Sequence, residues 1–505
     1  MEATGERLAA TMNPSDVVMW NVERDPKLRT TIVAIALLDR APAWERLRDR
    51  LEHGWIHVPR LRQRVASPPL GLGPPRWVWD EHFDLDIHLR RVVAPAPATL
   101  RTVLDLAGPI AMTAFDKDRP LWEFTLVEGL TDGRAALIQK VHHSLTDGVG
   151  GVRLARLLLD TERDGTDAAA AADDEATGAP TGHAEDSSGL SLATHALADD
   201  VRGAVTLARR SAEVAPRLAW RGMWDPVGLA TDGARTARSV AKMLAPVREP
   251  LSPVMVGRVL SRHLDVLDVP LQRLRAAGRA ADATLNDAYL AAVTGGMRRY
   301  HDHHGAPAER LRVTMPINRR RATDTVGDNR FTPARFAVPI DEADPAARMG
   351  ELGELARAWR REPGVPLTDA IAGALTALPP QATTAVLAGM LKAMDLVVTN
   401  VPGLDERVYL AGAEVIGDYG FAPTSGSAAS ITLLSHVGTC CVGLSADTAA
   451  VEDPDVLARC LADGFDEVLA LAPEPPPRAA DEPTPDEPAT GPATADTATP
   501  AGASS

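Results

Sequence analysis

The sequence has few cysteines and no long apolar run. Only Cys440, Cys441 and Cys460 occur among 505 residues, and two of them are adjacent. An odd count with this spacing excludes a disulfide framework and fits a reducing compartment. No run of 18 or more apolar residues occurs, so we expect no transmembrane helix. The chain opens with polar residues and has no apolar signal-peptide core, so we expect a cytoplasmic protein.

A dense basic patch is also missing. The formal net charge is −15, but residues 161–190 contribute −7 and residues 474–505 contribute −5, which leaves −3 for the remainder. The folded body is therefore close to neutral, and we expect no nucleic-acid partner. The cysteines and histidines have no spacing typical of zinc sites, so we expect no bound metal. The stretch His301-Asp302-His303-His304-Gly305 follows an expected helix, which favours a solvated loop over a metal cluster.

The length predicts two domains, because a single core of this size is uncommon. We expect the following segments: an N-terminal domain over residues 1–160, a disordered acidic insert over 161–193, a helical crossover over 194–250, a C-terminal domain over 251–472 and a disordered tail over 473–505. The insert lacks aromatic residues and cannot bury enough apolar surface to offset its ordering entropy. The crossover admits two interpretations, a helix packed on the body or an amphipathic surface that contacts a membrane.

The apolar patterning predicts a mixture of helices and strands. Residues 135–141 form an apolar run that predicts a buried strand, and Thr131-Asp132-Gly133 joins it to a second strand at 120–130 as a hairpin. Residues 83–89 alternate in polarity and predict a further strand. A long helix is predicted over residues 288–300, with Asp287 suited to its N-terminal end. The sequence therefore predicts an α+β fold.

One stretch combines several groups that bear on chemistry. His142, His143, Asp147 and Gly148 lie between the predicted strand at 135–141 and a segment with helical apolar spacing. Adjacent strand residues point to opposite faces, so only one of the two histidines can face a given cleft. Asp147 stays near the pair, and Gly148 permits a tight or left-handed turn. This arrangement suits a histidine that acts as a general base while its neighbours fix its orientation. The glycines at 148–151 do not form a phosphate-binding loop, because no lysine follows at the required spacing.

The pattern His142-His143-x-x-x-Asp147-Gly148 resembles the active-site signature of acyltransferases that take acyl groups from coenzyme A or carrier proteins. Further blocks narrow the resemblance to the bacterial wax ester synthase/diacylglycerol acyltransferase family. In chain order these blocks are Ser15-Asp16, Trp77-Val78, Phe83-Asp84-Leu85 with His88, Pro120-Leu121-Trp122, Asn286-Asp287, Met315-Pro316-Ile317-Asn318-Arg319, Gly327-Asp328-Asn329-Arg330 and Thr399-Asn400-Val401-Pro402-Gly403. The resemblance covers residues 10–160 and 250–470.

The resemblance implies two chloramphenicol-acetyltransferase-like domains with an active-site tunnel between them. It also implies that an acyl group passes from acyl-CoA to a hydroxyl acceptor, with His143 as the general base and no covalent enzyme intermediate. An imidazole with an ordinary pKa of about 6.5 can take the hydroxyl proton during attack, and such catalysis contributes about 10²–10⁴-fold. Acyl-CoA is then a co-substrate, and no cofactor is expected.

Two residues of the motif are expected to support His143. His142 packs or forms hydrogen bonds locally in the favoured interpretation. Asp147 either orients His143 directly or pairs with an arginine that shapes the loop, for which Arg319 and Arg320 are candidates.

The remaining predicted site residues each have two interpretations. Pro120, Leu121 and Trp122 either hold the neighbouring strand or line the pocket. Asn286 either donates a hydrogen bond to the developing oxyanion or caps its helix, and Asp287 accompanies it. Gly148 completes this set of binding or structural residues.

The leading acceptors are diacylglycerol, which gives triacylglycerol, and a long-chain alcohol, which gives a wax ester. Such substrates dissolve in membranes, so we expect peripheral association with the inner membrane or with lipid droplets. Two alternatives stay open. One is acyl transfer from a carrier protein to a polyketide or peptide product, and the other is a non-catalytic lipid-binding or droplet-coating protein.

Overall fold

The structure is a computed structural model that describes residues 11–54, 58–68, 73–165, 220, 223–318 and 331–473. The chain divides into a compact unit, Met1–Ala472, and a second unit, Pro473–Ser505. The predicted tail and most of the predicted acidic insert lie outside the described residues. All of the elements below belong to the compact unit.

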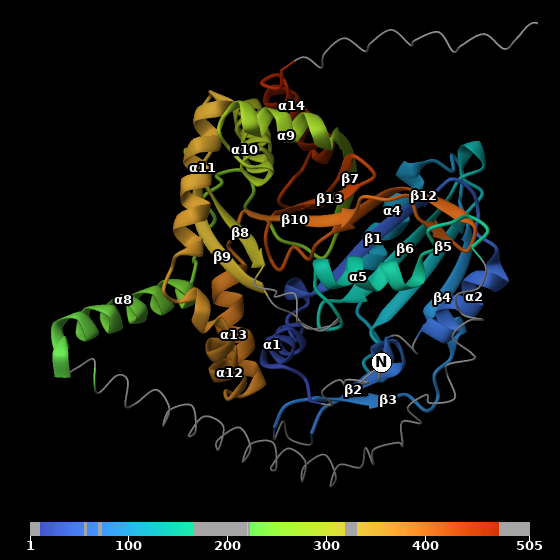
Figure 1. Cartoon of the computed structure of the whole chain (residues 1–505), viewed down its shortest axis with the longest axis horizontal. Coiled ribbons are helices and arrows are strands. Elements are labelled where there is room, and N and C mark those ends of the chain that lie inside the picture. The colour runs from blue at the N-terminus through green and yellow to red at the C-terminus, as the bar shows by residue number, and fades with distance from the viewer. Residues whose placement is uncertain are drawn as a thin grey trace, which may run out of the picture. The chain divides into compact units, whose positions relative to one another are not determined.

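One half of this unit is built on a six-stranded sheet (Figure 1). Its strands, in spatial order, are β11 (Tyr409–Leu410), β12 (Ala413–Phe421), β1 (Thr31–Leu38), β6 (Ala135–His142), β5 (Trp122–Glu128) and β4 (Leu89–Val93). Only the pair β4 and β5 is parallel. Because β1 alternates apolar side chains on both faces, Val33 and Ile35 pack against helix α4 (Leu100–Met112), while Ile32 and Ala34 face the opposite side.

The second half contains another six-stranded sheet. Its strands, in spatial order, are β7 (Arg262–Pro270), β14 (Thr439–Asp447), β13 (Ala429–His436), β10 (Leu396–Leu404), β8 (Arg310–Asn318) and β9 (Phe331–Pro339). Strand β10 runs parallel to β13 and β8, and the other pairs are antiparallel. Four helices lie together on one side of this sheet, α9 (Leu271–Ala280), α10 (Leu285–His303), α11 (Pro345–Arg360) and α14 (Pro454–Leu469) (Figure 1). Their apolar side chains join those of the sheet in one core.

Several of the remaining elements lie beside the space between the two sheets. Helices α1 (Pro14–Val22), α12 (Thr368–Thr376) and α13 (Pro380–Leu391) pack together beside it, and α5 (Gly148–Leu158) lies against β10. The other elements are α2 (Trp44–His53), α3 (Leu85–His88), α8 (Pro226–Leu244), the short strands β2 (Gln63–Ala66) and β3 (Arg76–Trp79), and the 3₁₀ turns η1 (Pro26–Leu28), η3 (Pro59–Arg62), η5 (Thr131–Gly133) and η7 (Val365–Leu367). The N-terminal part of helix α8 projects away from the body (Figure 1), while its C-terminal part packs on the second half, where Ser239 and Met243 are buried.

The structure confirms the α+β fold class and much of the local prediction. The hairpin through Thr131–Gly133 is present, because β5 and β6 pair antiparallel from Trp122 with Val141 to Val127 with Ala136. The predicted strand at 83–89 is wrong except at Leu89. The Asp84 side chain accepts the backbone N–H of Asp86 and starts the short helix α3, so the strand begins only at Leu89.

Two segment boundaries differ from the expectation. Strands β11 and β12 come from the predicted C-terminal domain at 251–472, yet they extend the first sheet, where β12 pairs with β1. The predicted insert at 161–193 begins with ordered residues, because Arg163 forms ion pairs with Asp39 at 2.8 Å and Glu414 at 3.1 Å. The second half of the sequence therefore supplies two strands to the first sheet.

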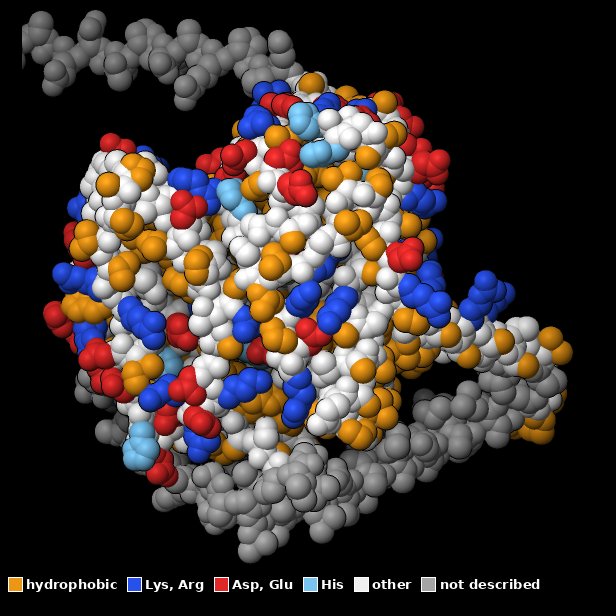
Figure 2. Space-filling view, turned by 180° about the vertical axis from the view of Figure 1, so that it is seen from behind, with side chains coloured by type: hydrophobic (Ala, Val, Ile, Leu, Met, Phe, Trp, Pro, Cys, Tyr) orange, Lys and Arg blue, Asp and Glu red, His pale blue; other side chains and the backbone are white. Residues whose placement is uncertain are grey.

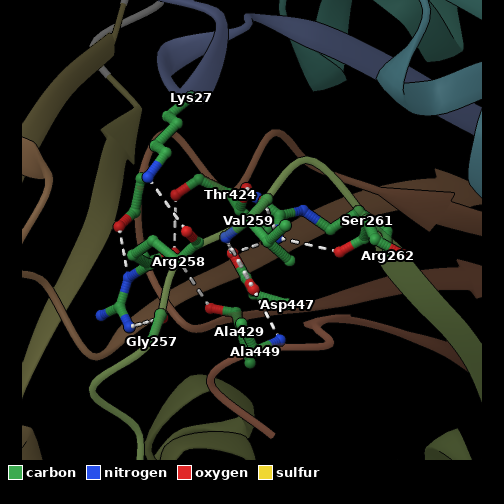
Figure 3. Close-up of polar contacts among 12 residues, drawn as sticks. Lys27, Gly257, Arg258, Val259, Ser261, Arg262, Thr424, Ala429, Asp447 and Ala449 are labelled. Atoms are coloured by element: carbon green, nitrogen blue, oxygen red, sulfur yellow. Dashed lines mark hydrogen bonds and ion pairs between the residues drawn. The ribbon is translucent and has the colours of Figure 1, made fainter.

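A buried polar cluster also joins distant parts of the chain (Figure 3). The Asp447 carboxylate lies 2.6 Å from the Arg262 guanidinium and accepts the backbone N–H groups of Val259 and Ala449. Arg262 in turn donates to Thr424 Oγ1 at 2.8 Å. Lys27 donates to the carbonyl of Arg258 at 3.0 Å, which ties the N-terminal segment to the second half.

The surface charge is mixed in sign. On the face shown in Figure 2, Lys and Arg side chains lie among Asp and Glu side chains over the described residues. This distribution agrees with the small net charge outside the two acidic segments.

Candidate active site

His143 lies where strand β6 gives way to helix α5. Its backbone N–H donates to the carbonyl of Thr30 at 2.9 Å, which continues the pairing of β6 with β1 for one residue. The side chain lines a cavity of about 360 Å³, whereas the His142 side chain does not. The alternation of strand residues thus separates the two histidines as the sequence predicts.

The cavity runs between the two sheets and is mostly apolar. The first sheet contributes Ile32, Ala34 and Val141, helix α1 contributes Val18, Met19 and Val22, and α13 contributes Leu387 and Leu391. Strand β10 and the loop at 422–425, which connects β12 to β13, close the cavity from the second half. Among the described lining residues, only His143, Asp147 and Asp418 carry titratable side chains. The cavity can therefore hold an aliphatic chain with one histidine in its wall.

His142 belongs to a buried network on the other face of the strand. The backbone N–H of Ser144 donates to its Nδ1 at 3.1 Å, and its Nε2 faces Thr30 Oγ1 at 3.1 Å and Glu23 Oε1 at 3.3 Å. The rings of Trp20 and Phe115 pack edge-on against the imidazole, each with a centroid distance of 6.0 Å. Because its ring nitrogens are engaged away from the cavity, His142 holds the strand end in place.

Glu23 completes this network. Burial acts to raise the pKa of Glu23, but the hydrogen bond and charge of His142 and the amide of Thr30 outweigh it and lower the pKa to about 2. The carboxylate is therefore ionised at neutral pH and fixes both Thr30 and His142.

Replacing Glu23 with glutamine is expected to destabilise the protein by up to about 3 kcal/mol at pH 7. The folded-state pKa lies below the ordinary value of 4.5, so the contribution is complete above pH 4.5 and is lost as the pH falls towards about 2. Thermal unfolding of the wild type and of Glu23→Gln between pH 8 and pH 3 measures the difference in stability and its dependence on pH. The gap in melting temperature should narrow below pH 4.5, and a constant gap contradicts the prediction. The exposed Glu52→Gln serves as the control.

Asp147 and Gly148 start helix α5 beside the cavity. Asp147 is the N-cap, and its Oδ1 accepts the backbone N–H of Gly150 at 2.7 Å. The candidate partners Arg319 and Arg320 lie outside the described residues. Of the tight or left-handed turn that was expected at Gly148, the left-handed backbone is absent. The small size of Gly148 matters for another reason, because a Cβ at this position would lie 2.8 Å from Cγ2 of Val401 on β10.

Replacing Gly148 with alanine is expected to cost about 1–3 kcal/mol in stability, because α5 and β10 would have to separate around a stiff branched side chain. Both Gly148 and Val401 line the cavity, so kcat/KM should fall as well. The matched control is Gly151→Ala in the same helix, where the nearest atom to a new Cβ lies 3.8 Å away. That variant should be neutral or stabilised, since alanine favours helix over glycine. Equal melting temperatures for the two variants would contradict the close-packing argument.

Pro120, Leu121 and Trp122 lie outside the cavity. Leu121 and Trp122 are fully buried, and the Leu121 carbonyl accepts the backbone N–H of His142 at 3.0 Å. The Trp122 indole donates to the carbonyl of Leu61 at 2.9 Å and stacks on His88 at 4.8 Å. Of the two interpretations, the structure favours the one in which this block holds the strand beside β6.

Asn286 and Asp287 lie in the first turn of α10. The N-cap of this helix is Thr284, which forms a capping box with Asp287, so Asn286 is not a cap. Asn286 Oδ1 accepts a hydrogen bond from Asn400 Nδ2 at 3.4 Å, and Asn400 lines the cavity while Asn286 lies behind it. Asn286 therefore reaches the cavity through Asn400, a residue that the sequence marked only as part of the block at 399–403.

Two groups of histidines and acidic residues have side chains of the kinds that bind metals. His301 is fully buried in α10 and bonded to Met297 and Ser252, so the predicted solvated loop is wrong at this residue. Within the described residues, His263, Asp265 and Asp455 have ligand atoms close enough for a metal ion, but all three lie apart from the cavity. None of the helices in the described ranges is both long enough and apolar enough to span a membrane.

Comparison with known proteins shows the family of this chain. The model of the wax ester synthase/diacylglycerol acyltransferase catalytic domain matches residues 12–289, and the model of the family's C-terminal domain matches residues 327–468. A protein of Mycobacterium tuberculosis strain H37Rv, provisionally named a diacylglycerol O-acyltransferase, is 38% identical over 483 residues, which is 95% of this chain and 96% of that protein. Another with the same provisional name is 29% identical and covers 85% of this chain and 90% of its own.

Solved structures share the fold. The wax ester synthase/diacylglycerol acyltransferase from Marinobacter aquaeolei VT8 superposes with a TM-score of 0.59 at 23% identity, over 92% of this chain and 99% of its own. The first condensation domain of the calcium-dependent antibiotic synthetase gives a TM-score of 0.56 at 14% identity, over 92% of this chain and 98% of its own. The family models together cover most of the chain. The chain therefore belongs to the wax ester synthase/diacylglycerol acyltransferase family of acyltransferases.

Proposed function

We propose that the protein transfers a long-chain acyl group from acyl-CoA to diacylglycerol, to a long-chain alcohol, or to both. The observation that supports this best is the position of His143, a potential base in the wall of a cavity lined mostly by apolar side chains. Such a cavity suits two aliphatic substrates that meet at a single polar group.

In this mechanism His143 accepts the proton of the acceptor hydroxyl as its oxygen attacks the thioester carbonyl. The carbonyl oxygen becomes an oxyanion, for which the Asn400 amide, held by Asn286, is the proposed hydrogen-bond donor. The carbon–sulfur bond then breaks, the imidazolium returns its proton to the thiolate, and ester and free CoA leave. Acyl-CoA is a co-substrate in this scheme, and no resident cofactor takes part.

The proposed substrates imply a lipid surface. Trp220, Met223 and Trp224 lie just before the start of α8 and are 63%, 64% and 72% exposed. Exposed tryptophans of this kind favour the interface of a lipid layer, because the ring is apolar and its N–H is polar. These residues support peripheral association with the inner membrane or with lipid droplets.

A competition assay tests the proposed function. Purified protein receives labelled palmitoyl-CoA with diacylglycerol and hexadecanol together, and the products are separated by lipid chromatography. Triacylglycerol or wax ester is the expected product. Transfer only from an acyl carrier protein would instead establish the carrier-dependent alternative, and binding of lipid without transfer from either donor would establish a non-catalytic role.

A further inference from the structure

Asp418 is a carboxyl group in the wall of a cavity that is otherwise largely apolar. It lies on β12, where it pairs with Ala36 of β1, and its neighbour on the same face, Gly420, pairs with Ala34. Ala34 and Gly420 also line the cavity. Both residues are small, and the cavity extends over this part of the sheet beside the carboxyl group.

The carboxyl group of Asp418 lacks a hydrogen-bonding partner at one oxygen. Within the described parts of the chain, its Oδ1 is buried and no group donates to or accepts from it. Burial alone raises the pKa of Asp418 to about 7. A carboxyl oxygen that is buried without a partner destabilises a protein, so the position of Asp418 in the cavity wall calls for an explanation in terms of ligand binding.

The position of Asp418 along the sheet separates it from the reacting atoms. Ala36, its partner on β1, pairs in turn with Leu137 on β6, and Leu137 precedes His143 by six residues. At about 3.3 Å per strand residue, this places Asp418 about 20 Å from His143 along the strands. The carboxyl group is therefore remote from the thioester and the attacking hydroxyl, and it can meet only a distal part of a long chain.

We propose that Asp418 is a specificity residue that receives a hydroxyl group carried by a long-chain substrate far from its reacting end. This inference rests on the proposed function, and it specifies the substrate class. A plain alkyl chain would remove water from the carboxyl group and leave it unpaired, whereas a distal hydroxyl both donates to and accepts from it. A site built around such a hydrogen bond discriminates strongly against the analogue that lacks the hydroxyl.

The hydroxyl can belong to either substrate, and two arms of one experiment distinguish these sources. The donor arm compares ω-hydroxypalmitoyl-CoA with palmitoyl-CoA on hexadecanol. The acceptor arm compares hexadecanediol, corrected for its two equivalent ends, with hexadecanol on palmitoyl-CoA. In one arm the wild type should prefer the hydroxylated substrate by about 5- to 150-fold in kcat/KM.

Three variants test whether the preference for the hydroxylated substrate depends on Asp418. Asp418→Leu removes the carboxyl group at similar volume, so its preference should fall close to one and its activity on the plain chain should rise. Asp418→Asn keeps a hydrogen-bonding group and should retain part of the preference. Gln139→Leu is the control, because it removes another polar side chain from the cavity wall on β6 and should leave the preference intact. Circular dichroism verifies that each variant is folded.

Three results would overturn the inference: no preference of the wild type in either arm, an undiminished preference in Asp418→Leu, or an equal loss in Gln139→Leu. Calorimetric binding of the same ligand pairs to the full-length His143→Ala protein separates this inference from the proposed function, because binding requires no turnover. If no ester forms with any donor but the hydroxylated ligand still binds more tightly in an Asp418-dependent way, the proposed function fails and the assignment of Asp418 survives.

Discussion

Replacing His143 with alanine is expected to lower kcat/KM for acyl transfer by about 10²–10⁴-fold. Two titratable side chains of the described cavity wall, His143 and Asp147, lie at the turn between β6 and α5. Asp147 caps α5 through the backbone N–H of Gly150, so His143 is the side chain expected to take the proton. Transfer of label from palmitoyl-CoA to hexadecanol and to diacylglycerol measures the loss. Because the His143 side chain faces the cavity, the melting temperature should change little.

The matched control for this variant is His82→Ala, which removes an exposed histidine from the loop before α3. That variant should keep both activity and stability. A His143→Ala protein that keeps full activity would exclude His143 as the base. A protein that loses activity together with several degrees of melting temperature would point instead to a structural role like that of His142.

The opposite orientation of the two histidine side chains is the part of the site that the sequence predicted best. Alternation along a strand is a local property, so two adjacent residues must point to opposite faces whatever the rest of the fold does. The capping role of Asp287 and the hairpin through Thr131–Gly133 were accessible for the same reason. Each depends on residues only a few positions apart.

Contacts between residues far apart in the sequence determine the rest of the site, and the sequence alone did not predict them. The pattern of β12 predicts a strand, but it does not reveal that this strand leaves the second half and pairs with β1. Asp418 lies on that strand, and therefore its place in the cavity wall was out of reach of the sequence. The same applies to Gly148, whose requirement for a small side chain comes from Val401, about 250 residues further along the chain. Asn400 was visible only as part of a resemblance, because its partner Asn286 lies on another element.

Replacing Asp447 with alanine is expected to destabilise the protein by about 3–5 kcal/mol. Asp447 is fully buried, and its removal leaves the Arg262 guanidinium without its charge partner at 2.6 Å. The backbone N–H groups of Val259 and Ala449 also lose their acceptor (Figure 3). Urea denaturation followed by tryptophan fluorescence and by circular dichroism measures the change, and coincident transitions support a single free energy of unfolding.

The control for charge removal is Asp105→Ala, which breaks an exposed ion pair with Arg101 on α4 and should cost no more than about 0.5 kcal/mol. A similarly small effect for Asp447→Ala would show that the buried cluster contributes little.

Arg262→Met separates stability from function, because Asp447 keeps its two amide donors while Thr424 loses the guanidinium that holds its hydroxyl. Thr424 belongs to the loop that closes the cavity from the second half. Arg262→Met should therefore be milder than Asp447→Ala in unfolding and should still lower kcat/KM, since the loop between β12 and β13 would no longer be fixed against the substrate.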